Sequence, residues 1–157
     1  MKKLLLALGF ATFATSVLAD APIKPDPTLT PGVVNTQVTK ETYCVSGYTG
    51  QKGVRNVPDS IKKQVFAEYK IDPKSDKFEI DHLISLELGG SNDTRNLWPQ
   101  SYRGHWNARI KDMLENRLHY LVCAKVIPLR EAQYVISHNW IEAYCKYVPS
   151  VICKGLE

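Results

Sequence analysis

The residues best suited to chemistry in this 157-residue chain lie between Asp81 and His105. A carboxylate and an imidazole are adjacent at Asp81 and His82, Asn96 follows fourteen positions later, and His105 nine positions after that. A neutral imidazole can take a proton from water near neutral pH, and a bound divalent cation can stabilise charge on an attacked phosphate. Asn96 can donate and accept hydrogen bonds at once, so it could fix the orientation of the imidazole. These residue types indicate metal-assisted hydrolysis.

A β-hairpin followed by a helix must position these residues. Apolar and polar residues alternate from Phe78 to Leu88, which is typical of a strand. Residues 89–93 (Gly-Gly-Ser-Asn-Asp) are a dense turn signal, and a second short strand is expected from Arg95 to Trp98. From about Trp106 the apolar residues recur with the period of a helix.

This pattern resembles the HNH, or ββα-metal, nuclease family, and within it small secreted bacterial proteins with an Asn-Leu-Trp-Pro segment. The resemblance is close from Phe78 to Asn116 and looser from Tyr43 to Tyr144. The residues that carry it are Asp81-His82, Gly89-Gly90-Ser91, Asn96-Leu97 and His105.

The resemblance implies a role for each of four residues. His82 would be the general base, Asp81 a metal ligand, Asn96 the residue that pins the hairpin and orients the base, and His105 a second metal ligand. A histidine four residues after His105 would complete a two-histidine face, but Arg109 stands there and cannot bind a cation. The register of the helix is therefore open, and three residues are alternatives to His105: Asn107, Asp112 and Asn116.

The activity implied by the resemblance is that of an exported, metal-dependent endonuclease that hydrolyses phosphodiester bonds in DNA or also in RNA. Mg²⁺ is the expected cofactor if oxygen ligands dominate, and a histidine ligand would favour Mn²⁺, Ni²⁺ or Zn²⁺. The rate should rise with pH through the imidazole pKa, roughly 6–7. No recognition helix or zinc finger is evident, so cleavage without sequence specificity is expected. The alternative is a non-catalytic, disulfide-stapled module that binds nucleic acid or another exported protein.

Five basic residues are candidates for contacts with nucleic-acid phosphate. The guanidinium fork of arginine suits phosphate oxygens, and two of the five are close in sequence to the proposed metal ligands. For any one of them the alternative is ordinary solvated surface charge. The five are Arg55, Arg95, Arg103, Arg109 and Lys111.

The first 19 residues read as an export signal. Lys2 and Lys3 precede an apolar run, and a small-residue cleavage site ends at Ala19. A membrane anchor is the alternative, but the run is short and Asp20 follows at once. Removal of the two lysines takes the formal charge from +4 to +2, so bulk charge does not demand a polyanionic partner. We expect a periplasmic or secreted protein without a membrane anchor, and nothing in the sequence indicates an oligomer.

The four cysteines are an even number in a chain expected to be exported, which favours two disulfides with three possible pairings. Cys145 and Cys153 are close in sequence and could clip the C-terminus, which leaves Cys44 for Cys123. A zinc site is the alternative, but the sequence has no Cys-x-x-Cys pair.

The remaining segments complete an α+β fold, a small β-hairpin plus helix packed among additional helices. Residues 20–41 contain four prolines and are expected to form an extended or disordered leader, so that the nuclease-like domain covers residues 42–157. Residues 42–54 look irregular or strand-like, and helices are expected over residues 58–70 and from Pro128 onward.

Overall fold

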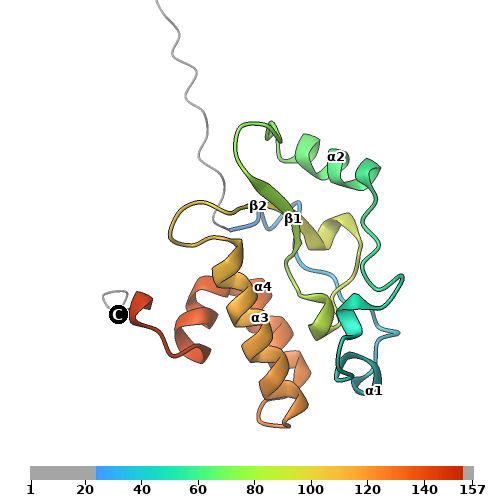
Figure 1. The fold of residues 1–157 in the computed structure, drawn as a ribbon, viewed down its shortest axis with the longest axis vertical. Coiled ribbons are helices and arrows are strands. Elements are labelled where there is room, and N and C mark those ends of the chain that lie inside the picture. Colours follow the sequence, from blue (N-terminus) through green and yellow to red (C-terminus); the bar gives the residue numbers. More distant parts are fainter. Residues whose placement is uncertain (1–23, 154–157) are drawn as a thin grey trace, which may run out of the picture.

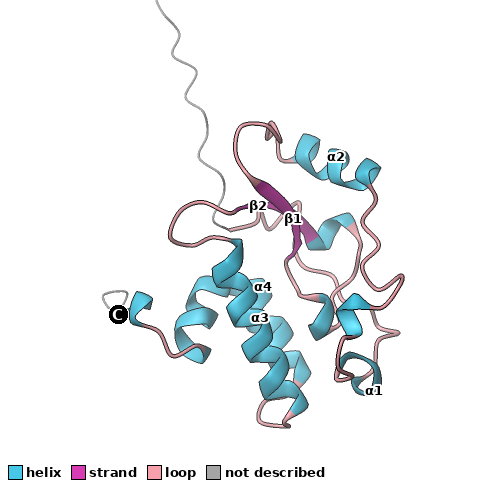
Figure 2. Cartoon of the chain, viewed as in Figure 1, coloured by secondary structure: helices cyan, strands magenta, loops and turns pink. Residues whose placement is uncertain are grey.

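A computed structural model describes residues 24–153 (Figure 1). The expected export signal, residues 1–19, and the start of the leader, residues 20–23, lie outside the described residues. The described chain forms a two-stranded antiparallel hairpin, four α-helices and several 3₁₀ turns (Figure 2). The predicted α+β class is therefore confirmed.

The hairpin pairs β1 (Phe78–His82) with β2 (Leu97–Ser101), and α3 (Ala108–Cys123) follows it. Asp81 lies opposite Trp98 in the ladder, and His82 opposite Leu97. Figure 1 shows α2 on one side of the hairpin and the α3–α4 pair on the other. The strand, strand and helix that the sequence predicts are thus present in that order.

The hairpin connection is longer than the alternation of residues predicted. Strand β1 ends at His82, and Leu86–Leu88 form the 3₁₀ turn η2 instead of continuing the strand. A second 3₁₀ turn, Thr94–Asn96, precedes β2. Leu86 and Leu88 are both buried, as they would also be on one face of a strand, so their apolar character does not distinguish the two conformations.

The helices begin at residues with clear start signals. Helix α2 (Asp59–Glu68) follows Pro58, and α4 (Leu129–Tyr147) follows Pro128. Helix α3 begins at Ala108, where the side chain of Asn107 accepts hydrogen bonds from the first free backbone N–H groups. The segment expected to be irregular or strand-like instead contains α1 (Lys40–Tyr43) and the 3₁₀ turn η1 (Tyr48–Gly50), and residues 42–54 contain no strand.

Two apolar clusters hold these elements together. The larger one joins α3 to α4 and η2, with fully buried Leu114, Leu118 and Ile136 at its centre. The smaller one packs Val65 of α2 against the hairpin. Full burial of a leucine or isoleucine side chain is worth about 1.5–3 kcal/mol, so the larger cluster holds α3 firmly against α4 and the hairpin connection.

The described part of the predicted leader, residues 24–39, contains turns and a β-bridge and packs against the hairpin connection. Thr30 is buried and its hydroxyl donates a hydrogen bond to the Leu97 carbonyl at 2.8 Å. The N–H of Gly32 donates to the backbone carbonyl of Arg95 at 3.0 Å, and Val34 forms a β-bridge with Gly90. The described leader therefore buttresses the loop that joins β1 to β2.

Both predicted disulfides are confirmed. Cys44–Cys123 joins the end of α1 to the end of α3, and Cys145–Cys153 ties the end of α4 to the chain that follows it. Two disulfides within one chain indicate that the protein folds in an oxidising compartment. No helix in residues 24–153 is long and apolar enough to cross a membrane.

Candidate functional site

His82 is buried at the end of β1, and both of its ring nitrogens face a polar side chain. The Nε2 atom lies 3.0 Å from Oδ1 of Asn92, and the Nδ1 atom lies 3.3 Å from Nη1 of Arg55. Only 2% of the residue is exposed, because the loops that carry Arg55 and Asn92 cover the end of the strand. Three separate segments therefore meet at this imidazole.

The tautomer of His82 follows from how Asn92 is held. The Nδ2 atom of Asn92 donates to the carbonyl of Val54 at 2.8 Å, and its Oδ1 accepts from the N–H of Asn56 at 3.1 Å. These two contacts fix the amide so that an oxygen faces His82, and an amide oxygen can only accept. The proton of neutral His82 is therefore on Nε2, and the lone pair of Nδ1 accepts a hydrogen bond from Nη1 of Arg55.

The imidazole stays neutral over a wide pH range. Burial lowers the pKa of His82 to about 4, although the Asn92 hydrogen bond and the charge of Asp81 act against that shift. Arg55 and Lys111 add to the lowering because their positive charges disfavour the imidazolium. The expected rise in rate through pH 6–7 assumed an exposed imidazole, and burial moves this titration to a lower pH.

Asn96 holds the loop between the two strands. It is fully buried, its Oδ1 accepts from the N–H of Ile84 at 3.0 Å, and its Nδ2 donates to the carbonyls of Ile84 and Ser91 at 3.0 and 2.9 Å. Gly90 is required here, because a Cβ at that position would lie 1.8 Å from the Ile84 carbonyl oxygen. Asn96 therefore pins the hairpin as expected, whereas Asn92 makes the contact that orients the imidazole.

Asp81 is bound by a buried lysine. Its Oδ2 lies 2.7 Å from Nζ of Lys111, which also donates to the His82 carbonyl at 2.7 Å and to Glu115. Lys111 is fully buried, and its three N–H groups donate hydrogen bonds to these three oxygens. The prediction of a phosphate contact by Lys111 is therefore wrong for this structure. The helical pattern could not show this, because α3 turns Lys111 inward against β1.

The charged groups of this cluster shift one another's pKa values. Burial alone would lower the pKa of Lys111, but the charges of Asp81 and Glu115 outweigh it and raise that pKa, so Lys111 stays protonated. Burial raises the pKa of Glu115 to about 8, although Lys111 acts in the opposite direction. Lys111 thus neutralises the buried side of Asp81 and joins β1 to α3.

Two further carboxylates are close enough to Asp81 to sense its charge. Glu79 shares a face of β1 with Asp81, and its Oε2 accepts a 2.6 Å hydrogen bond from the hydroxyl of Tyr102. Burial, then the charges of Asp81 and Asp112, raise the pKa of Glu79. Loss of hydration, then the charge of Asp81, raises the pKa of Asp112 in the first turns of α3. The carboxylates of Glu79 and Asp112 are therefore within range of the charge of Asp81, and carboxylate oxygens are the ligands that Mg²⁺ prefers.

His105 lies in the exposed loop before α3, where its ring packs edge-on against Trp106 at 5.2 Å between centroids. Among residues 24–153, no group of three His, Cys, Asp or Glu side chains that includes Asp81 brings its ligand atoms within 4.8 Å of one another. A metal role for His105 remains a prediction from the resemblance.

The structure separates the three alternatives to His105. Asn107 caps α3 with its Oδ1 and donates from Nδ2 to the Gly104 carbonyl, so both ends of its amide are engaged. Asn116 is exposed and donates to the backbone of Asp112. Of the three, Asp112 is the residue whose carboxylate is placed to interact with Asp81.

Among the four predicted arginine contacts, Arg55 is the one that reaches His82. Its Nη2 is anchored on the Ile80 carbonyl at 2.7 Å, and the side chain is exposed. The other three have partners elsewhere: Arg95 with Asp93 at 2.9 Å, Arg103 with Asp76 at 2.6 Å, and Arg109 over the ring of Tyr102.

Three residues of the site were not identified from the sequence: Glu79, Asn92 and Glu115. Strand alternation from Asp81 could have found Glu79, and the four-residue helical spacing from Lys111 could have found Glu115. Asn92 carries no such signal, because it lies in a turn where asparagine is common for local reasons.

Comparisons with protein-family models, curated proteins and solved structures find no match to this chain.

Proposed function

We propose that this protein is a metal-dependent endonuclease of the HNH type that hydrolyses phosphodiester bonds in DNA. One observation carries the proposal: a buried, neutral His82 held through Nε2 by Asn92, with the lone pair of Nδ1 beside the exposed guanidinium of Arg55. A general base needs a lone pair in a fixed direction, and a phosphate needs a cationic partner close to that base. Here the Nδ1 lone pair accepts a hydrogen bond from Nη1 of Arg55, which would move to the substrate phosphate and free Nδ1 for the water.

In this proposal Nδ1 of His82 takes the proton from the attacking water. Arg55 binds a non-bridging phosphate oxygen with the part of its guanidinium that is not anchored on Ile80. A base with a pKa of about 4 is weaker than the optimum for neutral pH. The negative charge of a bound phosphate favours the imidazolium, so substrate binding raises the pKa of His82 toward the working pH.

The carboxylates beside His82 suit a divalent cation in their chemistry. Asp81 and Asp112 would hold it, with Glu79 as a further candidate ligand, while Lys111 keeps the buried side of Asp81 in place. Such a cation would stabilise the charge on the phosphate oxygens and on the leaving oxygen. Mg²⁺ is the first candidate because all three groups offer oxygen.

One observation favours a second candidate, a non-catalytic nucleic-acid-binding module. Asp81 already has a cationic partner in Lys111, so its charge is balanced in part without a metal ion. A binding module would keep the exposed Arg55 and the pinned hairpin but would need no water activation.

The two candidates differ in a plasmid-nicking assay with the oxidised protein. The nuclease converts supercoiled plasmid to nicked and linear forms with Mg²⁺ or Mn²⁺, stops with excess EDTA, and recovers when the cation is restored. Full activity in excess EDTA would exclude the metal-dependent mechanism. Salt-dependent plasmid binding without cleavage, under every cation tried, would favour the binding module. Single-stranded RNA in parallel reactions tests the substrate range.

A further inference from the structure

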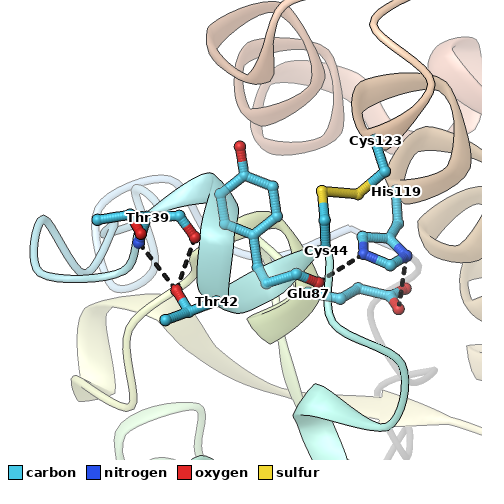
Figure 3. The surroundings of a disulfide bond; sticks show 7 residues. Thr39, Thr42, Cys44, Glu87, His119 and Cys123 are labelled. Carbon is cyan, nitrogen blue, oxygen red and sulfur yellow. Dashed lines mark hydrogen bonds and ion pairs between the residues drawn. A yellow bond between two sulfur atoms is a disulfide. The ribbon is translucent and has the colours of Figure 1, made fainter.

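A second group of ligand-type side chains lies at the C-terminal end of α3, apart from His82. Cys44, Cys123 and His119 each place one ligand atom so that all three atoms lie within 4.8 Å of one another. Figure 3 shows the imidazole beside the Cys44–Cys123 disulfide, with the carboxylate of Glu87 next to the ring. These residues come from three segments: the end of α1, the 3₁₀ turn η2 and the last turns of α3.

His119 is oriented as a metal-binding histidine would be. Its Nε2 lies 2.8 Å from the carbonyl oxygen of Tyr43, which can only accept, so this nitrogen carries the proton. Histidines that bind metals commonly donate the second N–H to a backbone carbonyl, which fixes the ring and frees the other nitrogen. In His119 the nitrogen left to bind a cation is Nδ1, on the side of Glu87.

The Nδ1 atom of His119 faces the carboxylate of Glu87 at 3.6 Å, which is too long for a hydrogen bond. Ligand bonds of about 2.0–2.3 Å in a tetrahedral zinc site put ligand atoms about 3.3–3.8 Å apart. The separation of these two atoms therefore matches two ligands of one cation. His119 and Cys123 are four residues apart on α3, which places both on one face of the helix.

A cavity of about 290 Å³ opens onto this group, lined among others by Cys44, Glu87 and His119. All four side chains are partly exposed, so a solvated ion can reach them. The group therefore has three donors within 4.8 Å of one another and a fixed imidazole, with the Glu87 carboxylate beside that imidazole as a candidate fourth donor. It lacks two free thiolates.

We propose that reduction of the Cys44–Cys123 disulfide converts this group into a tetrahedral site for Zn²⁺ or a similar soft cation. The ligands are the two cysteine sulfurs, Nδ1 of His119 and a carboxylate oxygen of Glu87. A dithiol supplies the two electrons and two protons: its sulfurs join in a new disulfide, and Cys44 and Cys123 become thiols. Each thiol then releases its proton to water as its sulfur binds the cation. The oxidised protein has no thiolate to offer, so the disulfide excludes the ion.

In this proposal the end of α1 and the end of α3 can be linked in two ways, by the disulfide or by a bound metal ion. In the oxidising compartment that the disulfides indicate, the covalent bond holds Cys44 to Cys123. Under reducing conditions, zinc joins the same two sulfurs and preserves the packing of α1 on α3. This inference is independent of the proposed nuclease activity, which resides at the other end of α3.

The test uses the Cys145→Ser/Cys153→Ser protein, in which Cys44 and Cys123 are the remaining cysteines. The protein is reduced with dithiothreitol, freed of it by anaerobic gel filtration, and titrated with Co²⁺ and then Zn²⁺. One equivalent of Co²⁺ should give the visible absorption of a tetrahedral ion and a thiolate charge-transfer band, and Zn²⁺ should displace it. The same protein left oxidised should give neither signal. A reduced protein without a stoichiometric cobalt spectrum would overturn the proposal.

The Zn²⁺ affinities of variants distinguish a four-ligand site from metal binding by the two cysteine thiols alone. His119→Ala should weaken Zn²⁺ binding more than about 100-fold and Glu87→Gln about 10-fold, whereas His138→Ala, an exposed histidine stacked on Tyr134, should have no effect. Circular dichroism of each oxidised variant checks its folding. Unchanged affinity in both the His119 and the Glu87 variants would mean that the thiols bind alone, and it would refute the site. A reduced, cobalt-loaded protein that stays unfolded by circular dichroism would refute it as well.

Discussion

The Nε2 atom of His82 lies 3.0 Å from Oδ1 of Asn92, and this contact decides which ring nitrogen can accept a proton. Asn92 is held by Val54 and Asn56, so its amide cannot turn without loss of two hydrogen bonds. The loop of residues 51–58 therefore controls the tautomer of an imidazole on β1.

The first prediction concerns the pH dependence of cleavage. Because burial lowers the pKa of His82 to about 4, the neutral base is lost only as the pH falls through that value. The cleavage rate of the wild type at concentrations far below saturation, which reports the free enzyme, should therefore fall at low pH and be flat with respect to His82 above about pH 5. Asn92→Asp places a carboxylate beside Nε2, which favours the imidazolium, so the acid limb should move to higher pH. Single-turnover rates at each pH measure this shift.

Asn56→Asp serves as the control, because that side chain is exposed and only its backbone contacts Asn92. Its acid limb should match the wild type. Superimposable profiles for Asn92→Asp and the wild type would show that the contact does not tune His82.

The second prediction concerns the buried lysine. Lys111→Met removes the cation that pairs with Asp81 and Glu115 but keeps the length of the side chain. Loss of one partner leaves buried charge without compensation, so the free energy of unfolding should fall by about 3–5 kcal/mol. Lys146→Met removes an exposed lysine 3.8 Å from Glu131 and should leave stability nearly unchanged. Urea denaturation of both variants measures the difference, and equal stability would contradict a structural role for Lys111.

Much of the fold could be predicted from the sequence because its signals are local. Proline starts α2 and α4, strand-like alternation precedes a glycine-rich turn at residues 89–93, and an even number of cysteines allows few pairings. The end of β1 at His82 could not be predicted, because Leu86 and Leu88 fit an alternating strand equally well. Their burial within a 3₁₀ turn depends on α3 and α4.

The site was harder to predict because its decisive contacts are distant in sequence. Lys111 is thirty residues from Asp81, and nothing in a helical pattern distinguishes an inward lysine from a solvated one. Arg55 reaches His82 from a loop without regular structure, at a separation of 27 residues. Asn92 is an ordinary turn asparagine by sequence, and its role depends on the loop that packs over it.

The third prediction concerns the metal ligands. Asp112→Asn should weaken the binding of Mg²⁺ or Mn²⁺, because it removes a carboxylate that interacts with Asp81. His105→Ala should have little effect, because this exposed ring packs on Trp106 in the loop before α3. Mn²⁺ titration followed by electron paramagnetic resonance measures both affinities. Weaker binding in the His105 variant with normal binding in the Asp112 variant would reverse the assignment.

The fourth prediction compares the two disulfides. Cys44–Cys123 closes a loop with a sequence separation of 79, and Cys145–Cys153 one of 8. Cross-links restrict the unfolded chain more when the loop is longer, so replacement of both cysteines by serine should cost about 4–5 kcal/mol for the first pair and about 2–3 kcal/mol for the second. Chemical denaturation without added metal measures each cost. A larger loss from the second pair would contradict this order.

The central claim is that His82 activates water for phosphodiester cleavage. The most direct test is single-turnover cleavage of a DNA duplex by wild type and His82→Ala, beside a DNA-binding assay at the same salt and cation concentrations. General-base catalysis is worth about 10²–10⁴-fold, so the variant should cleave at least about 100-fold more slowly. It should bind DNA as the wild type does, because Arg55 remains anchored on Ile80. Cleavage by the variant within about threefold of the wild-type rate would show that His82 is not the base.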